Sequence, residues 1–362
     1  MPEFIPGIDL CGLFYREAVK PVLDENFPGL KYSAALIGWG SEVLGYDTPM
    51  SRDHHWGPRM ILFLEEKDLP RLGDKINRAL AENLPCEFMG YPTNYGKPEP
   101  NGVRHLVKIA KGPVDHMIAV TTVRDFFKAR LGVDPFKKLT AAGWLTFPQQ
   151  RLLVLTGGAV YHDGPGTLEK VRRKFEYYPR DVWLYMLAAQ WTRISREEPF
   201  AGRAGDVGDD LGSQVIAARL VREIMRLCFL MERQYAPYSK WFGTAFGNLK
   251  IARRLSPILR EVLPAPDWKE RERHLAKAFS MVARRHNALG ITKPLPTRAT
   301  RYFGRPYLVI HADVFAAAVF DEIGDPEIRN IKPKIGSIDQ FTDSTDVAEN
   351  PALCRKLGIA YR

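Results

Sequence analysis

The residue types best suited to chemistry lie close together between residues 38 and 64, in the segment GWGSEVLGYDTPMSRDHHWGPRMILFL. An apolar run ends in Gly40-Ser41, and Asp53 follows twelve residues after the serine, ahead of a second apolar run at 59–64. Gly40 allows a ligand to approach the backbone, and the Ser41 hydroxyl with nearby N–H groups can hold a phosphate. The Asp53 carboxylate can hold a divalent cation. Turn formation and helix capping explain either part taken alone.

A second group of candidates lies in the C-terminal half, around the string YAPYSKWFGTAF. The rings of Tyr238 and Trp241 can stack on a base, and the Lys240 ammonium can neutralise a phosphate. A packed turn between helices explains the same string with Lys240 on the surface. Arg219 and Arg222 lie on one helical face, which is compatible with an anion-binding stripe or with an ordinary solvated face.

Two further positions have both a structural and a functional interpretation. Asp209 precedes a predicted helix, where it can cap the N-terminus or act as the base for an acceptor nucleophile. His286 follows two arginines at the end of another predicted helix, where it can cap that helix or contact a substrate.

The spacing of apolar residues predicts an α+β chain, with an α/β domain at 1–140 and a mostly helical domain at 141–362. The predicted elements are a helix at 8–25, strands at 31–39, 59–64 and 116–123, a helix at 69–84, a loop at 91–101, a turn-rich hairpin at 157–166, helices at 181–193, 211–233, 244–262 and 268–289, a strand at 305–310, and a loosely ordered tail at 336–350.

Length and charge limit the functional classes. The 362 residues correspond to about two domains, at roughly 150 residues each. The chain has 52 basic and 42 acidic residues, and residues 1–140 contain 18 of each, so the whole excess lies in the C-terminal part. Such an excess suits nucleotide phosphates, an acidic substrate or nucleic acid. Nucleic acid is less favoured than a small molecule, because no Lys/Arg run or interleaved aromatic stripe marks a groove for it.

Cellular context follows from what the sequence lacks. No run approaches the roughly 18 apolar residues of a membrane span, and the first residues do not have the pattern of a secretory signal. The four cysteines have no paired spacing typical of zinc or redox sites. We therefore expect a cytoplasmic protein with reduced thiols and no membrane partner.

Taken together, Gly40, Ser41 and Asp53 resemble the motif of the nucleotidyltransferase fold of the DNA polymerase beta superfamily, which is Gly-Ser, about ten residues, then Asp-x-Asp on a strand. The chain resembles an uncharacterised bacterial family of that superfamily over nearly its full length. The strings that carry the wider resemblance are SRDHHWGPR, YYPRDVW, GDDLGS, YAPYSKWFGTAF and RRHN. The resemblance implies a nucleotidyltransferase-type α/β domain, a helical substrate-side domain and a ligand cleft between them.

One position departs from that motif, because His55 stands where the superfamily has its second aspartate. An imidazole suits Zn²⁺, Mn²⁺ or Co²⁺ better than Mg²⁺, so this position bears on the choice of metal. Asp47 can replace the missing charge, and Asp115 is the nearest candidate for the third carboxylate. The expected cofactor is a divalent metal, Mg²⁺ or Mn²⁺, bound by Asp53, His55, Asp47 and Asp115.

The resemblance implies transfer of a nucleoside monophosphate from a nucleoside triphosphate to a small-molecule acceptor. The expected catalytic residues are Asp53, His55 and Asp209, and the expected nucleotide-binding residues are Gly40, Ser41, Arg219, Arg222, Tyr238, Lys240 and Trp241. One alternative is a catalytically degenerate fold kept for ligand binding or regulation. Another is different chemistry on a phosphorylated or activated metabolite, with His55 as acid or base. Neither the acceptor, nor the nucleotide, nor the oligomeric state follows from the sequence.

Overall fold

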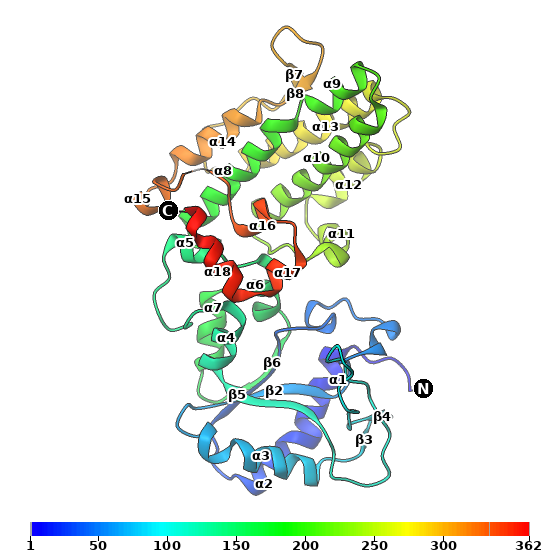
Figure 1. Ribbon diagram of the computed structural model, residues 1–362, viewed down its shortest axis with the longest axis vertical. Helices are drawn as coiled ribbons and strands as arrows, with labels where there is room; N and C mark the ends of the chain where they lie inside the picture. The colour runs from blue at the N-terminus through cyan, green and yellow to red at the C-terminus, as the bar shows by residue number, and fades with distance from the viewer. Residues whose placement is uncertain (1, 333, 362) are drawn as a thin grey trace. The chain divides into compact units, whose positions relative to one another are not determined.

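The chain divides into two compact units (Figure 1). The computed structural model describes residues 2–332 and 334–361. Unit 1 comprises Met1–Lys138 and Arg151–Glu176, and unit 2 comprises Leu139–Gln150 and Tyr177–Arg362. The expected α+β class, with an α/β region followed by a mostly helical one, is confirmed. Arg151–Glu176 lies in unit 1, although a division at residue 140 assigns it to the second domain.

Unit 1 contains a four-stranded sheet of order β5-β2-β1-β6. β1 (Tyr32–Leu36) pairs antiparallel with β2 (Arg59–Leu64) and with β6 (Ala159–Asp163), and β2 pairs parallel with β5 (Met117–Thr122). Every residue of β1 and β2 is buried, as their nearly continuous apolar runs require. The three strands predicted before residue 140 are confirmed.

Helices cover both faces of this sheet. On one face Phe14, Leu62 and Leu80 belong to a single apolar cluster, which joins the N-terminal helices and α3 to the strands. On the other face the Phe126 ring of α4 lies 5.3 Å from the Phe63 ring of β2. The helices of unit 1 are α1 (Gly7–Phe14), continued through a π-turn (Tyr15–Val19) into α2 (Lys20–Asn26), α3 (Leu69–Asn83), α4 (Val123–Leu131), α6 (Gln149–Thr156), whose first two residues lie in unit 2, and α7 (Thr167–Lys174).

The hairpin predicted at 157–166 is wrong, because this segment forms the single strand β6 at the edge of the sheet. Gly158 makes the turn between α6 and β6. Its φ is +67°, and a Cβ atom there would collide with the carbonyl oxygen of Leu36 in β1. The turn therefore needs glycine both for its backbone conformation and for the close approach of β1.

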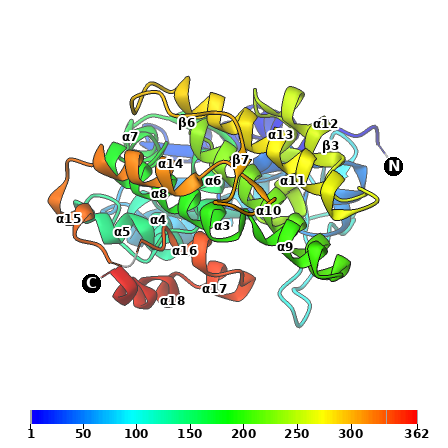
Figure 2. The same ribbon diagram turned by 90° about the horizontal axis from the view of Figure 1, so that it is seen from above.

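Unit 2 is organised around the buried helix α8, along which α10 and α14 pack (Figures 1 and 2). The long helices predicted here are confirmed, except for the one at 244–262. Unit 2 contains α5 (Ala141–Leu145), α8 (Arg180–Glu197), α9 (Phe200–Asp206), α10 (Asp210–Met231), α11 (Ser239–Gly247), α12 (Ala252–Arg260), α13 (Trp268–Asn287), β7 (Thr300–Arg301), β8 (Leu308–Val309), α14 (Ala312–Asp321), α15 (Pro326–Arg329), α16 (Ile338–Phe341), α17 (Thr345–Glu349) and α18 (Pro351–Lys356).

Two predictions for unit 2 are wrong because distant side chains fix the backbone. The helix predicted at 244–262 is split into α11 and α12, and the Glu232 carboxylate accepts the N–H groups of Lys250 (2.8 Å) and Ile251 (2.9 Å) at the break. The tail at 336–350 is ordered into α16 and α17. The buried Gln340 amide donates to the carbonyl of Met186 and to the side chain of Gln190, both at 3.0 Å.

His286 is part of the core of unit 2. Its Nδ1 accepts a hydrogen bond from the indole of Trp191 (3.2 Å), and its ring packs edge-on against Phe315. Burial lowers the pKa of His286 to about 4, so the imidazole is neutral at physiological pH. These contacts favour the structural interpretation of this residue.

Within the described residues, no helix is both long enough and apolar enough to cross a membrane. The four cysteines all lie in this part of the chain, and none forms a disulfide.

We expect Gly158→Ala to lower the free energy of unfolding of unit 1 by about 3 kcal/mol, because the new methyl group displaces the backbone of β1. Gly166→Ala is the matched control, since Gly166 has a similar φ of +71° but no atom within 4 Å of the position of a Cβ. It should cost only about 1 kcal/mol of backbone strain. Differential scanning calorimetry measures both, and equal losses would show that the contact with β1 is unimportant.

Candidate functional site

The Gly-Ser turn lies directly after β1, in the loop Gly38–Ser41. Gly40 has a φ of +107°, and a Cβ atom there would collide with the carboxylate of Glu42 and the guanidinium of Arg59. Glycine is therefore required here by packing. The Ser41 hydroxyl is half-buried and has no hydrogen-bond partner among the described residues. The loop thus presents a polar hydroxyl beside a close backbone turn.

A buried ion pair joins this loop to the start of β2. The Arg59 and Glu42 side chains are only 2% and 4% exposed, and Arg59 Nε donates to Glu42 Oε1 at 3.1 Å. Arg59 Nη2 also donates to the carbonyl oxygen of Trp39 at 2.9 Å. Each charge is compensated within the protein, which a buried charge requires.

Two guanidinium groups lie against the Trp39 ring. The Arg59 and Arg130 carbons Cζ are 4.9 and 4.7 Å from its centroid, within the range of cation–π attraction. Arg151 donates from Nη1 to the Arg130 carbonyl at 3.1 Å. Burial, with Arg151 and Arg59 close by, lowers the pKa of Arg130. We call Arg59, Arg130 and Arg151 the arginine cluster.

Sequence reasoning missed this cluster. Arg59 is the first residue of a strand, Arg130 is the next-to-last residue of α4, and Arg151 lies early in α6. No spacing rule connects three arginines from three elements. The only available signal was that Arg59 stands at the polar end of an otherwise apolar strand.

Asp53 and His55 lie ahead of β2 rather than on it. Asp53 ends a 3₁₀ helix (Pro49–Asp53), is 65% exposed at its side chain and pairs with His54 Nδ1 at 2.9 Å. His55 has a φ of +52°, and its Nδ1 is buried with no hydrogen-bond partner among the described residues. Burial and the neighbouring charges of His54 and Arg59 lower the pKa of His55. The neutral imidazole can therefore act as a metal ligand or as a hydrogen-bond partner.

Asp47 and Asp115 already have protein partners. Asp47 Oδ2 accepts the backbone N–H of Gly7 (2.7 Å) and the indole N–H of Trp56 (2.9 Å). Asp115 Oδ2 lies 2.6 Å from Arg104 Nη2. Across residues 2–332 and 334–361, no three His, Cys, Asp or Glu side chains gather closely enough to hold a metal ion. Metal binding by these four residues stays a prediction.

The aromatic-lysine string of unit 2 is only partly exposed. Lys240 Nζ lies 5.1 Å from the Trp241 ring centre, and the backbone N–H of Tyr238 donates to Gln150 at 3.1 Å. The Tyr238 side chain is 42% exposed. These three residues form one local group, and their role in nucleotide binding stays a prediction.

The arginines and the aspartate of α10 have structural partners. Arg219 pairs with Glu197 at 3.1 Å, and Arg222 donates two hydrogen bonds to Asp343 (2.8 and 2.6 Å), which lower the pKa of that carboxyl. Asp209 caps α10 by accepting the N–H of Gly212 at 2.8 Å. Their predicted functional roles stay predictions.

The structure brings two of the sequence strings together in unit 2. The Tyr235 ring lies 5.1 Å from Tyr177 and 5.3 Å from Tyr178, and burial raises the pKa of Tyr177 and Tyr178. YYPRDVW and YAPYSKWFGTAF therefore share one buried aromatic cluster.

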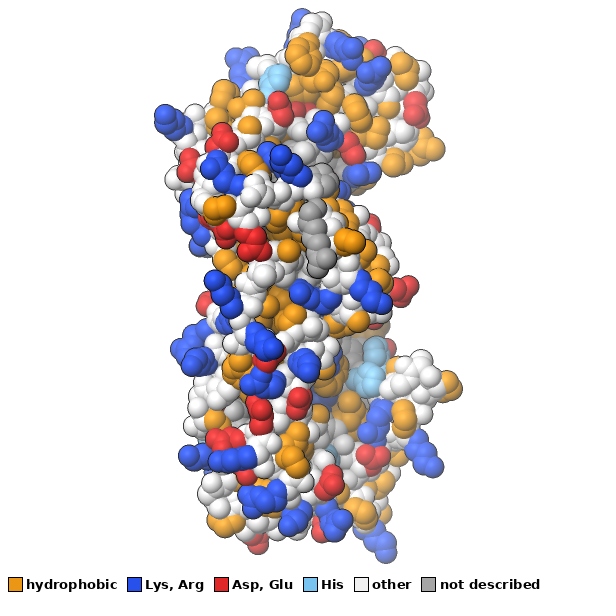
Figure 3. Space-filling model, turned by 60° about the vertical axis from the view of Figure 1, so that its left-hand side comes forward, with side chains coloured by type: hydrophobic (Ala, Val, Ile, Leu, Met, Phe, Trp, Pro, Cys, Tyr) orange, Lys and Arg blue, Asp and Glu red, His pale blue; other side chains and the backbone are white. Residues whose placement is uncertain are grey.

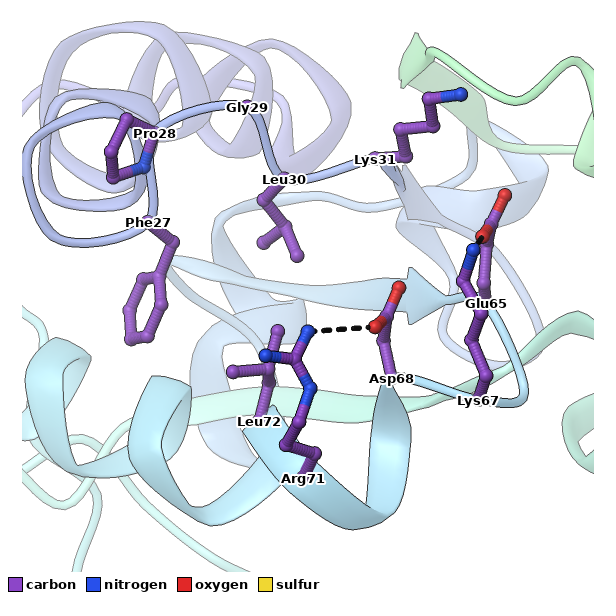
Figure 4. Close-up of a pocket in the computed structure, with 10 residues that line it drawn as sticks. All are labelled: Phe27, Pro28, Gly29, Leu30, Lys31, Glu65, Lys67, Asp68, Arg71 and Leu72. Carbon is purple, nitrogen blue, oxygen red and sulfur yellow. Dashed lines mark hydrogen bonds and ion pairs between the residues drawn. The ribbon is translucent and has the colours of Figure 1, made fainter.

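A pocket of about 690 Å³ opens in unit 1 at the other end of β1 and β2 (Figure 4). Its charged lining includes the pairs Lys67–Glu65 (2.8 Å) and Arg71–Asp68 (3.0 Å), above apolar side chains such as Leu30. No residue predicted for the site lines this pocket.

Parts of the chain are similar to a family model and to a solved structure. Residues 144–242 match a family model described as a domain of unknown function (DUF4037). No curated protein matches the chain. Among solved structures, the chain is similar to the crystal structure of a nucleotidyltransferase-like protein from Exiguobacterium sibiricum 255-15, with 8% identity and a TM-score of 0.34 over 76% of each chain. Similarity at this level does not establish a common fold.

The contrast between Asp47 and Asp53 can be tested by stability alone. We expect Asp47→Asn to lower the free energy of unfolding by about 1–3 kcal/mol, because two donors lose their charged acceptor. Asp53→Asn should change it by less than about 0.5 kcal/mol, as an exposed position allows. Urea titration followed by tryptophan fluorescence measures both, and a larger loss for Asp53→Asn would contradict this assignment.

Proposed function

We propose that unit 1 binds the phosphates of a nucleoside triphosphate at the Gly38–Ser41 loop and transfers the nucleoside monophosphate to a small-molecule acceptor. The observation that carries this proposal is the presence of Arg59 and Arg130 against Trp39, which belongs to the loop. A guanidinium donates two parallel hydrogen bonds to a phosphate, so an arginine that lies against this loop suits such a ligand.

Arg130 is the cluster member best able to bind an added anion. Arg59 is compensated by Glu42, whereas no carboxylate among the described residues forms an ion pair with Arg130. Its lowered pKa means that the fold disfavours its charged form. A bound phosphate would remove this penalty, which favours binding at this place.

Transfer would need more than phosphate binding. The Ser41 hydroxyl would orient the triphosphate, and Asp53 is accessible to bind a cation together with phosphate oxygens. His55 Nδ1 could be the second protein ligand of this cation, because it is a buried nitrogen without a partner in the described part of the chain. A divalent ion at Asp53 would neutralise charge that develops on the phosphates.

A second candidate function is nucleotide binding without transfer. Asp47 and Asp115 are both engaged by protein donors, so Asp53, which is exposed and pairs with His54, is the carboxylate of the predicted metal set with no arginine or backbone donor among the described residues. This arrangement favours a regulatory or ligand-binding role if the ion is held too weakly for catalysis. The two functions share the same phosphate site and differ in whether product forms.

We expect Arg130→Gln to weaken binding of a non-hydrolysable ATP analogue with Mn²⁺ by at least about tenfold, since a charge-assisted hydrogen bond is lost. Isothermal titration calorimetry on the full chain measures this. Lys128→Gln is the matched control, because Lys128 is exposed on the same helix and should bind like the wild type. Equal affinities for all three proteins would exclude this phosphate site.

We expect His55→Asp to raise affinity for Mg²⁺ in the presence of nucleotide, because it restores a second carboxylate. Aspartate tolerates the positive φ of this position. His54→Asp is the comparison variant, since it adds the same charge one residue away. Titrations with Mg²⁺ and Mn²⁺ distinguish them, and an unchanged Mg²⁺ affinity in His55→Asp would show that His55 does not contact the ion.

A further inference from the structure

The net charge of the chain is concentrated in one segment of unit 2. Residues 250–310 contain 14 basic and 4 acidic residues, so they account for the full net charge of +10. Twelve of the basic side chains are exposed, whereas only two of the acidic ones are. The segment forms α12, α13, β7 and β8. α12 contacts α13, α13 contacts β8, and β8 pairs with β7. On the face drawn in Figure 3, Lys and Arg side chains are scattered among acidic and hydrophobic ones.

A hydrogen bond brings two basic regions of this segment together. Lys277, Ser280 and Arg284 lie three and four residues apart, so they share one face of α13. The backbone N–H of Ala299 donates to Ser280 Oγ at 3.4 Å. The chain entering the β7–β8 hairpin, with Arg298 before Ala299, therefore lies on the face of α13 that carries Lys277 and Arg284. We call Lys277, Arg284, Arg298, Arg301 and Arg305 the basic face.

The charges of the basic face are not compensated within the protein. None of its five side chains forms an ion pair or hydrogen bond with the described residues. No acidic residue occurs between Glu272 and Asp313. Like charges held together without counter-charge repel one another and attract a polyanion.

An exposed aromatic side chain adjoins these cations. Phe303 lies in the turn of the β7–β8 hairpin, is 80% exposed and has a φ of +53°. The neighbouring Tyr302 ring lies 4.8 Å away in an edge-on arrangement. Flat rings between cations suit stacked bases of an unpaired strand, whose phosphates bind the flanking charges.

We propose that the basic face and Phe303 form a binding surface for single-stranded nucleic acid. Phosphates contact the arginines and Lys277, and a base stacks on Phe303. This surface is independent of the phosphate site proposed for unit 1, because every residue that forms it belongs to unit 2.

The test uses the full chain and a fluorescein-labelled 20-nucleotide oligouridylate, followed by fluorescence anisotropy at 50 and 200 mM salt. Reversing three charges in Arg298→Glu/Arg301→Glu/Arg305→Glu should weaken binding at least about tenfold and reduce the salt dependence. The matched control Lys75→Glu/Arg78→Glu/Lys108→Glu reverses three exposed, unpaired charges of unit 1 and should stay within about twofold of the wild type.

Stacking is tested separately from charge. Phe303→Ala should weaken binding at least about fivefold, and Phe303→Tyr should retain it. Circular dichroism confirms that each variant is folded.

Three results would overturn the proposal. They are no binding by the wild type at 50 mM salt, equal loss in the basic-face and control variants, and binding to phosphatidylserine vesicles that depends on the basic face when oligouridylate binding does not.

Discussion

The buried pair of Glu42 and Arg59 determines the geometry at the candidate site of unit 1. A charge removed from water costs several kcal/mol unless a partner compensates it, so neither side chain can be buried without the other. The pair therefore fixes the residue after Ser41 against the first residue of β2. Gly40 must lack a side chain because the pair occupies the space beside it. The packing of this pair therefore explains the glycine of the Gly-Ser turn without any ligand.

Asp53 lies ahead of the strand that this pair anchors. Arg59 already occupies the start of β2, and Asp53 lies six residues earlier in a 3₁₀ helix. The sequence predicts a motif carboxylate that leads directly into this strand. Here the strand begins with a cation that binds Glu42. Among the described residues Asp53 pairs only with His54, and its side chain is 65% exposed, so its chemistry depends on what a ligand brings.

The sequence predicts the parts of the fold that depend on local apolar patterns. β2 coincides with the apolar run from Arg59 to Leu64. α3 coincides with the segment 69–84, where apolar residues recur at helical spacing. Predictions failed where one remote atom decides the backbone. β6 can pair with β1 only because Gly158 has no Cβ to collide with the carbonyl oxygen of Leu36. The break before α12 depends on the Glu232 carboxylate, which accepts the N–H of Ile251. Neither contact leaves a periodic signal.

The residues of the candidate site likewise include some that the sequence predicts and some that only the packing reveals. Gly40 and Ser41 could be found from the motif, but Arg130 could not, because only the packing of α4 on the sheet brings it to Trp39. The basic residues considered for the two units accordingly differ in whether a carboxylate pairs with them. Arg59 in unit 1 pairs with a carboxylate and has a structural role. Arg222 and Arg219 in unit 2 are paired with carboxylates in the same way. No carboxylate in the described part of the chain pairs with Arg130 or with the basic face. Like charges that lie close together without a counter-charge repel one another, so an external anion would stabilise these residues.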